Sequence, residues 1–239
     1  MNNLSKNIDV DEAGSSNLPQ PTKPIIDLFL FRHGESEANT TTREFIGGRA
    51  TKSPLTNIGK QQAMALGRNL LSKGIRFDKV YCSTATRALE TAVIAVGHGR
   101  PLITNIKYQV EAYRELEELD QGLWEGAARE KTCTPKVLRE IKKNLLDFKA
   151  PKGESQREVG ERINKFINKH VLTHNPPKTI GIFFHGLAIK CWLQNIMNFD
   201  PKFIFPMQID NCSATRIQYN SKTKLWAIKF INLSKTAWV

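Results

Sequence analysis

Strand-like and helix-like segments alternate along most of the chain. Residues 25–31 form a nearly continuous apolar run, which is typical of a strand that is buried on both faces of a sheet. Residues 77–82 and 179–184 have a similar character, and we expect each to be a strand. Two further segments, at 214–219 and 225–231, predict a closing β-hairpin.

Helix-like segments lie between these strands. Thr56 can cap a helix that carries Ala63, Leu66 and Leu70 on one face and is stopped by Gly74. Further helices are predicted over residues 85–96, 136–148 and 187–197, and from Ser155 onward. This alternation favours an α/β fold, a three-layer sandwich in which helices flank a mostly parallel central sheet.

The chain divides into a tail and a domain. Residues 1–24 are polar and contain three prolines, so we expect a disordered N-terminal tail. The total length of 239 residues suits one domain with a well-buried core, or two small ones. The continuous alternation of elements favours a single domain over residues 25–239.

The net charge of the chain indicates which kinds of substrate and partner to expect. With 35 Lys and Arg against 23 Asp and Glu, the formal net charge is +12. A positive field attracts anions, which favours anionic substrates or partners. The basic residues are spread along the chain, so no specific nucleic-acid partner is expected, and most of this charge is assigned to solvated surface.

The sequence also favours a cytoplasmic location. No segment approaches the roughly 20 apolar residues of a membrane span, and the first 20 residues lack the apolar run of a signal peptide. The four cysteines show no paired spacing, which is typical of reduced thiols rather than of disulfides or a zinc site.

Two predicted strands end in the same way. Arg32, His33 and Gly34 follow the first strand, and His185 and Gly186 follow the strand at 179–184. In open α/β sheets, ligands bind beyond the carboxyl ends of the strands. Either histidine alone is as well explained by a structural hydrogen bond. The pair, with an arginine beside it, favours a shared anion site.

A second arginine follows a third strand. Arg87 lies in the first turn of the helix predicted after residues 77–82. Helix N-termini favour anions, and the planar guanidinium matches the oxygens of a phosphate. Read alone, Arg87 could equally be a surface arginine. Together with the two histidines it predicts a cationic pocket suited to phosphoryl transfer.

Six motifs follow one another along nearly the whole domain. They are RHGES at 32–36 with Asn39, SPLT at 53–56 with Gly59, Gln62 and Ala63, STATRA at 83–88 with Thr91-Ala92, LEELDQGLWEG at 116–126, GES at 153–155 with Arg162, and His185-Gly186. In this order they resemble the motifs of the histidine phosphatase superfamily, the phosphoglycerate-mutase-like enzymes, with an offset of one residue at the leucine of the fourth motif. Together they are far more specific than a single RHG.

The resemblance implies roles for the matching residues. His33 would attack phosphorus as a neutral imidazole and form a phosphohistidine; a histidine with an ordinary pKa of about 6.5 is largely neutral near pH 7. The phosphate-binding residues would be Arg32, Asn39, Arg87, His185 and the backbone of Gly186. No metal or other cofactor is required.

The family pattern also implies a general acid and base in an acidic segment. Glu118 would protonate the leaving oxygen and later deprotonate the attacking water, because it lies four residues before Gly122. Glu115 or Glu117 would take this role if the alignment slips. A solvated acidic loop is the remaining interpretation.

These features predict a metal-independent phosphomonoester hydrolase acting on a small phosphorylated substrate or a phosphoprotein. The additional segment typical of the mutases is not found, which favours hydrolysis over a mutase-type phosphoryl transferase. A non-catalytic phospholigand-binding protein is a further alternative. Residues 127–152 are expected to cap the pocket, and their lysines and arginines indicate either a polyanionic substrate or an exposed helix face. The oligomeric state cannot be read from the sequence.

Overall fold

A mixed sheet of six strands forms the centre of the protein. The computed structural model describes residues 25–41, 44–97, 110–173 and 176–234; the predicted tail, 1–24, lies outside them. The strands are β1 (Ile25–Arg32), β2 (Lys79–Ser83), β3 (Val110–Tyr113), β4 (Thr179–Phe184), β5 (Ala214–Asn220) and β6 (Leu225–Leu233). Their order across the sheet is β3-β2-β4-β1-β5-β6.

The pairing confirms the expected α/β class with a mostly parallel sheet. Strands β3, β2, β4 and β1 are parallel to one another. The predicted hairpin of β5 and β6 closes the sheet, and β5 pairs with β1 in antiparallel fashion. The carboxyl ends of β1, β2 and β4 therefore meet at one edge of the sheet.

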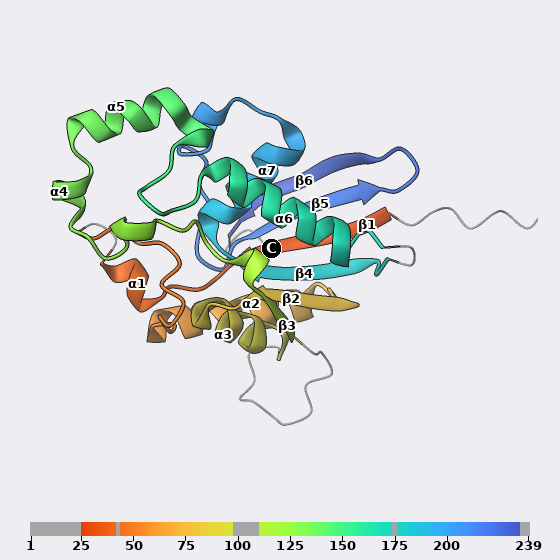
Figure 1. Ribbon diagram of the computed structural model, residues 1–239. Coiled ribbons are helices and arrows are strands. Elements are labelled where there is room, and N and C mark those ends of the chain that lie inside the picture. Colours follow the sequence, from red (N-terminus) through yellow and green to blue (C-terminus); the bar gives the residue numbers. More distant parts are fainter. Residues whose placement is uncertain (1–24, 42–43, 98–109, 174–175, 235–239) are drawn as a thin grey trace, which may run out of the picture.

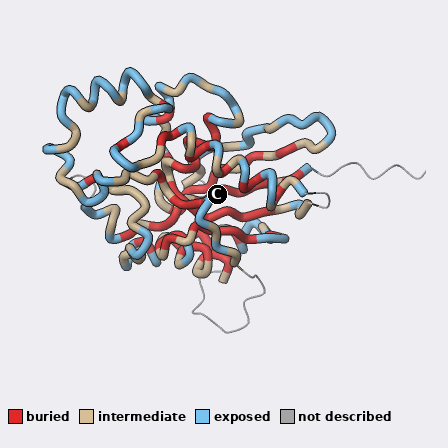
Figure 2. The backbone as a smooth tube through the Cα atoms, viewed as in Figure 1, coloured by how far each residue is buried: buried red, intermediate tan, exposed pale blue. Residues whose placement is uncertain are grey.

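Helices cover both faces of this sheet (Figure 1). On one face lie α2 (Asn57–Ser72) and α3 (Thr86–Val96), and on the other lie α6 (Gln156–His170) and α7 (Gly186–Met197). Side chains of β1 alternate between the two cores: Leu28 and Leu30 belong to the cluster with α6 and α7, and Phe29 and Phe31 to the cluster with α2 and α3. Figure 2 shows that buried residues concentrate in the strands and in the helix faces against them.

The predicted helix caps are present. The side chain of Thr56 accepts a hydrogen bond from the backbone N–H of Gly59 at the start of α2. Ser155 and Glu158 form a reciprocal capping box at the start of α6. Past the end of α2, Gly74 has a φ of +64°, a left-handed conformation that favours glycine and stops the helix as expected.

Several short elements were not predicted. Strand β3 has only four residues and no buried side chain, so it lacks the apolar run that marks the other parallel strands. Helices α1 (Glu37–Thr40) and α4 (Arg129–Thr132) are single turns. The helix expected over 136–148 is α5 (Pro135–Asn144), followed by a 3₁₀ turn at Leu145–Asp147.

Of these elements, α1, α4 and α5 lie beyond the edge of the sheet where the parallel strands end (Figure 1). The segment after α1 joins the segment before α4 through an isolated bridge between Phe45 and Ala128, and the N–H of Ile46 donates to the carbonyl of Ala127. Helices α4 and α5, which belong to the segment 127–152 expected to cap the pocket, thereby extend beyond the sheet edge. Over the described residues, every helix is too short or too polar to cross a bilayer.

The core on the α6 side should contribute strongly to stability. Phe166 is 2% exposed and its ring contacts those of Tyr81 and Tyr113. We expect Phe166→Ala to lower the free energy of unfolding by about 3–5 kcal/mol, because it leaves a cavity in a packed core. Leu71→Ala, at a position 51% exposed on α2, is the control and should change it by less than about 1 kcal/mol. Urea unfolding measures both, and similar losses in the two variants would contradict this assignment of the core.

Candidate active site

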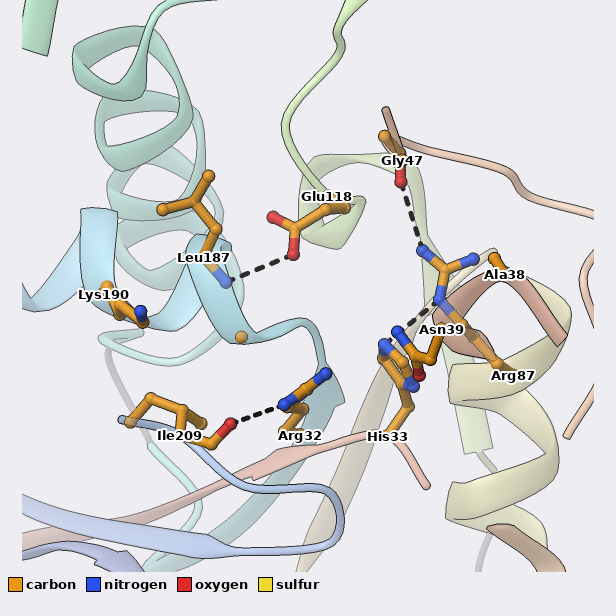
Figure 3. A pocket seen from close by; sticks show the side chains of 12 residues that line it. Arg32, His33, Ala38, Asn39, Gly47, Arg87, Glu118, Leu187, Lys190 and Ile209 are labelled. Atoms are coloured by element: carbon orange, nitrogen blue, oxygen red, sulfur yellow. Dashed lines mark hydrogen bonds between the residues drawn. The ribbon is translucent and has the colours of Figure 1, made fainter. Parts of the chain in front are cut away.

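Three strand ends bring the predicted cationic residues together. His33 directly follows β1, His185 directly follows β4, and Arg87 lies in the first turn of α3, after β2. Because β4 lies between β1 and β2, the three side chains converge, and the ring centroids of the two histidines are 5.2 Å apart. Figure 3 shows His33, Arg32 and Arg87 around one cavity.

Two glycines allow the chain to come this close. A Cβ on Gly34 would lie 2.6 Å from the carbonyl oxygen of Gly59, so the turn after His33 can pack on α2 only without a side chain. A Cβ on Gly186 would lie 3.2 Å from Cδ of Arg32. The glycine after each histidine is therefore explained by close approach within the site.

The hydrogen bonds of His33 fix its tautomer. Nδ1 lies 2.7 Å from the carbonyl oxygen of Gly34, which can only accept, so Nδ1 carries the proton. Nε2 then accepts a hydrogen bond from Nε of Arg87 at 3.1 Å. Burial, and next the positive charges of Arg87 and Arg32, lower the pKa of His33 well below 6.5. The result is a neutral imidazole with a lone pair on Nε2.

His185 is fully buried behind Arg87. Its Nδ1 lies 3.2 Å from Nη2 of Arg87, and its Nε2 lies 2.9 Å from Oγ of Ser83. Because a guanidinium only donates, Nδ1 is the acceptor and Nε2–H donates to the hydroxyl. Burial and the charge of Arg87 also lower the pKa of His185 well below 6.5. The two imidazoles therefore hold one guanidinium between them.

Both arginines are held by backbone carbonyls. Nη1 of Arg87 donates to the carbonyl oxygen of Ala50 at 2.8 Å. Nη1 of Arg32 donates to the carbonyl oxygen of Ile209 at 2.7 Å. Burial lowers the pKa of each guanidinium, but an arginine remains charged near neutral pH. The cationic groups are thus fixed before any anion binds.

Of the three carboxylates considered, Glu118 alone lines the cavity with His33. Its carboxylate accepts hydrogen bonds from the N–H groups of Leu187 (3.2 Å) and Ala188 (2.9 Å) at the start of α7. Glu117 points elsewhere, where it accepts from Thr84 and pairs with an arginine. Glu115 is exposed.

A charged pair braces the backbone that carries Glu118. Arg162 and Glu154 form a two-point ion pair, with Nε to Oε1 at 2.7 Å and Nη2 to Oε2 at 3.0 Å. The same guanidinium donates to the carbonyl oxygens of Glu115 (2.8 Å) and Glu118 (3.1 Å). This explains the GES motif and its arginine, because together they fix the loop that places the carboxylate.

The candidate site is a cavity of about 260 Å³. The structure brings Arg32, His33, Asn39, Arg87, Glu118 and Gly186 into its wall, and His185 lies immediately behind it. Lys190 and Ile209 also line the cavity and were missed by the sequence analysis. Lys190 lies four residues after Gly186, so helical spacing could have placed it on the same face of α7. Ile209 lies on a loop, where no periodicity indicates direction.

The basic residues of the capping segment do not line this cavity. All eight lysines and arginines in 127–152 are exposed, among them Lys142 and Lys143. Lys149 pairs with Glu158. Only Arg129 lines a second cavity that adjoins the first. The structure thus favours the exposed helix face over the polyanion-binding interpretation. Within the described ranges, no cluster of three or more His, Cys, Asp or Glu side chains is arranged to hold a metal ion.

Known proteins share this sequence pattern and this fold. The family model of the histidine phosphatase superfamily (branch 1) matches residues 28–234. A probable phosphoglycerate mutase of Cronobacter sakazakii is 28% identical over 211 residues, which cover 86% of this chain and 92% of the relative. A probable phosphoglycerate mutase of Yersinia enterocolitica is 27% identical over 213 residues, with the same coverage.

Solved structures agree with the fold. A mycobacterial glucosyl-3-phosphoglycerate phosphatase matches with a TM-score of 0.72 at 19% identity, over 88% of this chain and 100% of the other. A phosphoserine phosphatase of Entamoeba histolytica, in complex with 3-phosphoglyceric acid, matches with a TM-score of 0.70 at 22% identity, over 89% and 99%. At these identities the likeness shows the fold alone. The family match spans most of the chain and confirms the resemblance carried by the six motifs, so the chain belongs to the histidine phosphatase superfamily, branch 1.

Proposed function

We propose that this member of the superfamily is a metal-independent phosphomonoester hydrolase that works through a phosphohistidine on His33. The observation that carries the proposal is the neutral His33, whose Nε2 lone pair lies in a cavity with two guanidinium groups and one carboxylate. This arrangement supplies a nucleophile, a binding site for phosphoryl oxygens and a group that can transfer protons.

The first step forms the phosphohistidine. Nε2 of His33 attacks phosphorus, and the bond between phosphorus and the bridging oxygen breaks. Glu118 in its protonated form gives its proton to the departing alcohol oxygen. A bound phosphate dianion favours this protonated form, because two negative charges close together repel. Arg87 must release Nε2 as the substrate enters, and its guanidinium then faces the phosphoryl oxygens.

The second step returns the enzyme to its starting state. Glu118, now a carboxylate, takes a proton from water, and the water oxygen attacks phosphorus. The bond between phosphorus and Nε2 breaks, which releases inorganic phosphate and neutral His33. The oxygens are held by Arg32, Arg87 and Asn39, with the N–H of Gly186 as a further donor. His185 orients Arg87; its direct contact with substrate oxygens stays a prediction.

The main competing function is phosphoryl transfer between two positions of one substrate. The curated relatives carry the name phosphoglycerate mutase, which supports this second candidate. Hydrolysis is favoured because the mutase segment is not found between Gly126 and Gly153, and because several similar structures are named phosphatases. A non-catalytic phospholigand-binding protein is less favoured, since every catalytic position is filled. We expect a small phosphorylated substrate or a phosphoprotein as partner, and a cytoplasmic location.

Removing the nucleophile should abolish turnover. With p-nitrophenyl phosphate and a chelator present, we expect His33→Ala to lower kcat/KM by about a thousandfold or more, because no group replaces Nε2. Lys142→Ala, on the exposed face of α5, is the control and should retain full activity. Rapid acid-free quenching with radiolabelled substrate should trap label on the wild-type protein only.

Three outcomes, with p-nitrophenyl phosphate or with 3-phosphoglycerate as substrate, would overturn the proposal. Full activity in His33→Ala would remove the phosphohistidine mechanism. Conversion of 3-phosphoglycerate to its 2-isomer faster than release of inorganic phosphate would establish the mutase. Binding of phosphate without any turnover would establish the phospholigand-binding protein.

Substrates with different leaving groups can show which of the three carboxylates of the acidic segment is the general acid. We expect Glu118→Gln to lower kcat for an alkyl phosphate by about 10²–10⁴, because an alkoxide needs a proton to depart. The loss with p-nitrophenyl phosphate should be smaller in single-turnover phosphorylation, since p-nitrophenolate leaves unaided. Glu115→Gln and Glu117→Gln are matched controls without this leaving-group dependence. The same dependence in either control would reassign the acid.

The neutral histidines should resist protonation. The pKa of His33 and that of His185 lie well below 6.5, so both should remain neutral at pH 6.0, where roughly three quarters of an ordinary histidine is protonated. As the pH falls below about 6.5, these two histidines take up protons in the unfolded chain but not in the folded protein. The free energy of unfolding is therefore highest above about pH 6.5 with respect to these groups, and it decreases as the pH decreases. Nitrogen NMR of the side chains tests this. Titration of either ring at or above pH 6.5, the value expected in urea, would contradict it.

A further inference from the structure

A second cavity adjoins the phosphate-binding cavity. It has a volume of about 300 Å³ and shares Gly47, Gly48, Glu118 and Leu187 with the first. Glu118 therefore lies at the boundary between the two. In the proposed reaction this carboxyl protonates the bridging oxygen, so the alcohol portion of the substrate extends from that point into the second cavity.

The wall of this cavity is largely aromatic and aliphatic. Its apolar side chains include Ile46, Trp124, Ile141, Leu145, Phe148 and Phe205. The rings of Trp124 and Phe148 lie 5.6 Å apart at an angle of 37°. Phe205, which also lines the cavity, is 53% exposed. A wall of this kind binds an apolar group most favourably, because binding removes apolar surface of both from water.

Helix α5 supplies one side of the wall without being packed into a core. Ile141 of α5 and Leu145, the residue that directly follows the helix, line the cavity, whereas Lys142 and Lys143 are exposed. None of the residues of α5 is buried. Ile141 is therefore turned to the cavity from a helix that contributes no side chain to the packed core.

The charges in the wall disfavour a second anionic group. Its ionisable side chains are Glu118, Glu154, Arg129 and Cys133. Glu154 is paired with Arg162, and Nη2 of Arg129 donates to the carbonyl oxygen of Phe45. A carboxylate or second phosphate on the alcohol would thus meet two carboxylates and a single guanidinium, so the wall has no excess of positive charge to bind it. Gln121 and Gln156 offer uncharged hydrogen bonds instead.

We propose that the second cavity binds the alcohol portion of the substrate and that this alcohol is uncharged and largely apolar, with an aryl or bulky alkyl body. The inference rests on the proposed phosphohydrolase function and names its substrate class. The volume equals that of about ten water molecules at roughly 30 Å³ each, which suits a small ring system but not a long chain.

Alkyl phosphates with similar leaving groups test the substrate class. We expect kcat/KM for 2-phenylethyl phosphate to exceed that for ethyl phosphate, glycerol 1-phosphate and 3-phosphoglycerate by at least about tenfold, the effect of filling an apolar pocket. Phe148→Ala should reduce the ratio of 2-phenylethyl to ethyl phosphate by about tenfold. The double variant Lys142→Glu, Lys143→Glu, altered on the outer face of α5, should keep the wild-type ratio.

A binding measurement separates this proposal from the proposed function. Calorimetric titration compares 3-phenylpropylphosphonate with ethylphosphonate, neither of which can be hydrolysed. Tighter binding of the phenyl compound, weakened in Phe148→Ala, supports the apolar cavity even if no ester is turned over, in which case the hydrolase function alone fails. Equal affinity for the two phosphonates, or a preference for 3-phosphoglycerate among the esters, overturns the substrate class and leaves the phosphohistidine mechanism standing.

Discussion

The hydrogen bonds from one guanidinium to two neutral imidazoles determine the rest of the site. Arg87 donates to His33 and to His185, and in this way it connects the ends of three strands. The arrangement requires both rings to accept, which a protonated imidazole cannot do at the nitrogen concerned. Burial and the charge of Arg87 itself enforce neutrality. The contacts that assemble the site therefore also prepare its lone pair.

The carboxylate of Glu118 is held by a second set of contacts, independent of those made by Arg87. Glu118 reaches the cavity because its loop is fixed by Arg162, and because the first N–H groups of α7 hold its oxygens. The N-terminus of α7 is thus shared between the wall of the phosphate cavity and the carboxylate. A helix N-terminus stabilises negative charge, so it suits both a phosphoryl group and an ionised Glu118. Alternate loss and gain of a proton by Glu118 resolves this competition during the proposed cycle.

Family membership explains the phosphate side of the site better than the alcohol side. The six motifs supply the cationic cavity and its braces, whereas the adjoining cavity is built mainly from residues outside them, such as Ile141, Leu145 and Phe205. Relatives named mutases and similar structures named phosphatases share the fold. The alcohol portion of the proposed substrate is therefore indicated by residues of α4 and α5 and of the loops around them, and not by residues of the sheet.

The local pattern of the sequence was sufficient to predict most of the strands and helices that form the fold. Apolar runs and capping residues predicted the buried strands and long helices, because these signals depend on neighbours within a few residues. The rule that ligands bind at strand ends then placed His33, Arg87 and His185 together. Only the tertiary structure decided which carboxylate faces them. Glu117 and Glu118 are adjacent on an irregular loop, and their directions follow from distant partners rather than from any period. The same holds for the apolar cavity, since the sequence shows that α5 is amphipathic but not what its apolar face meets.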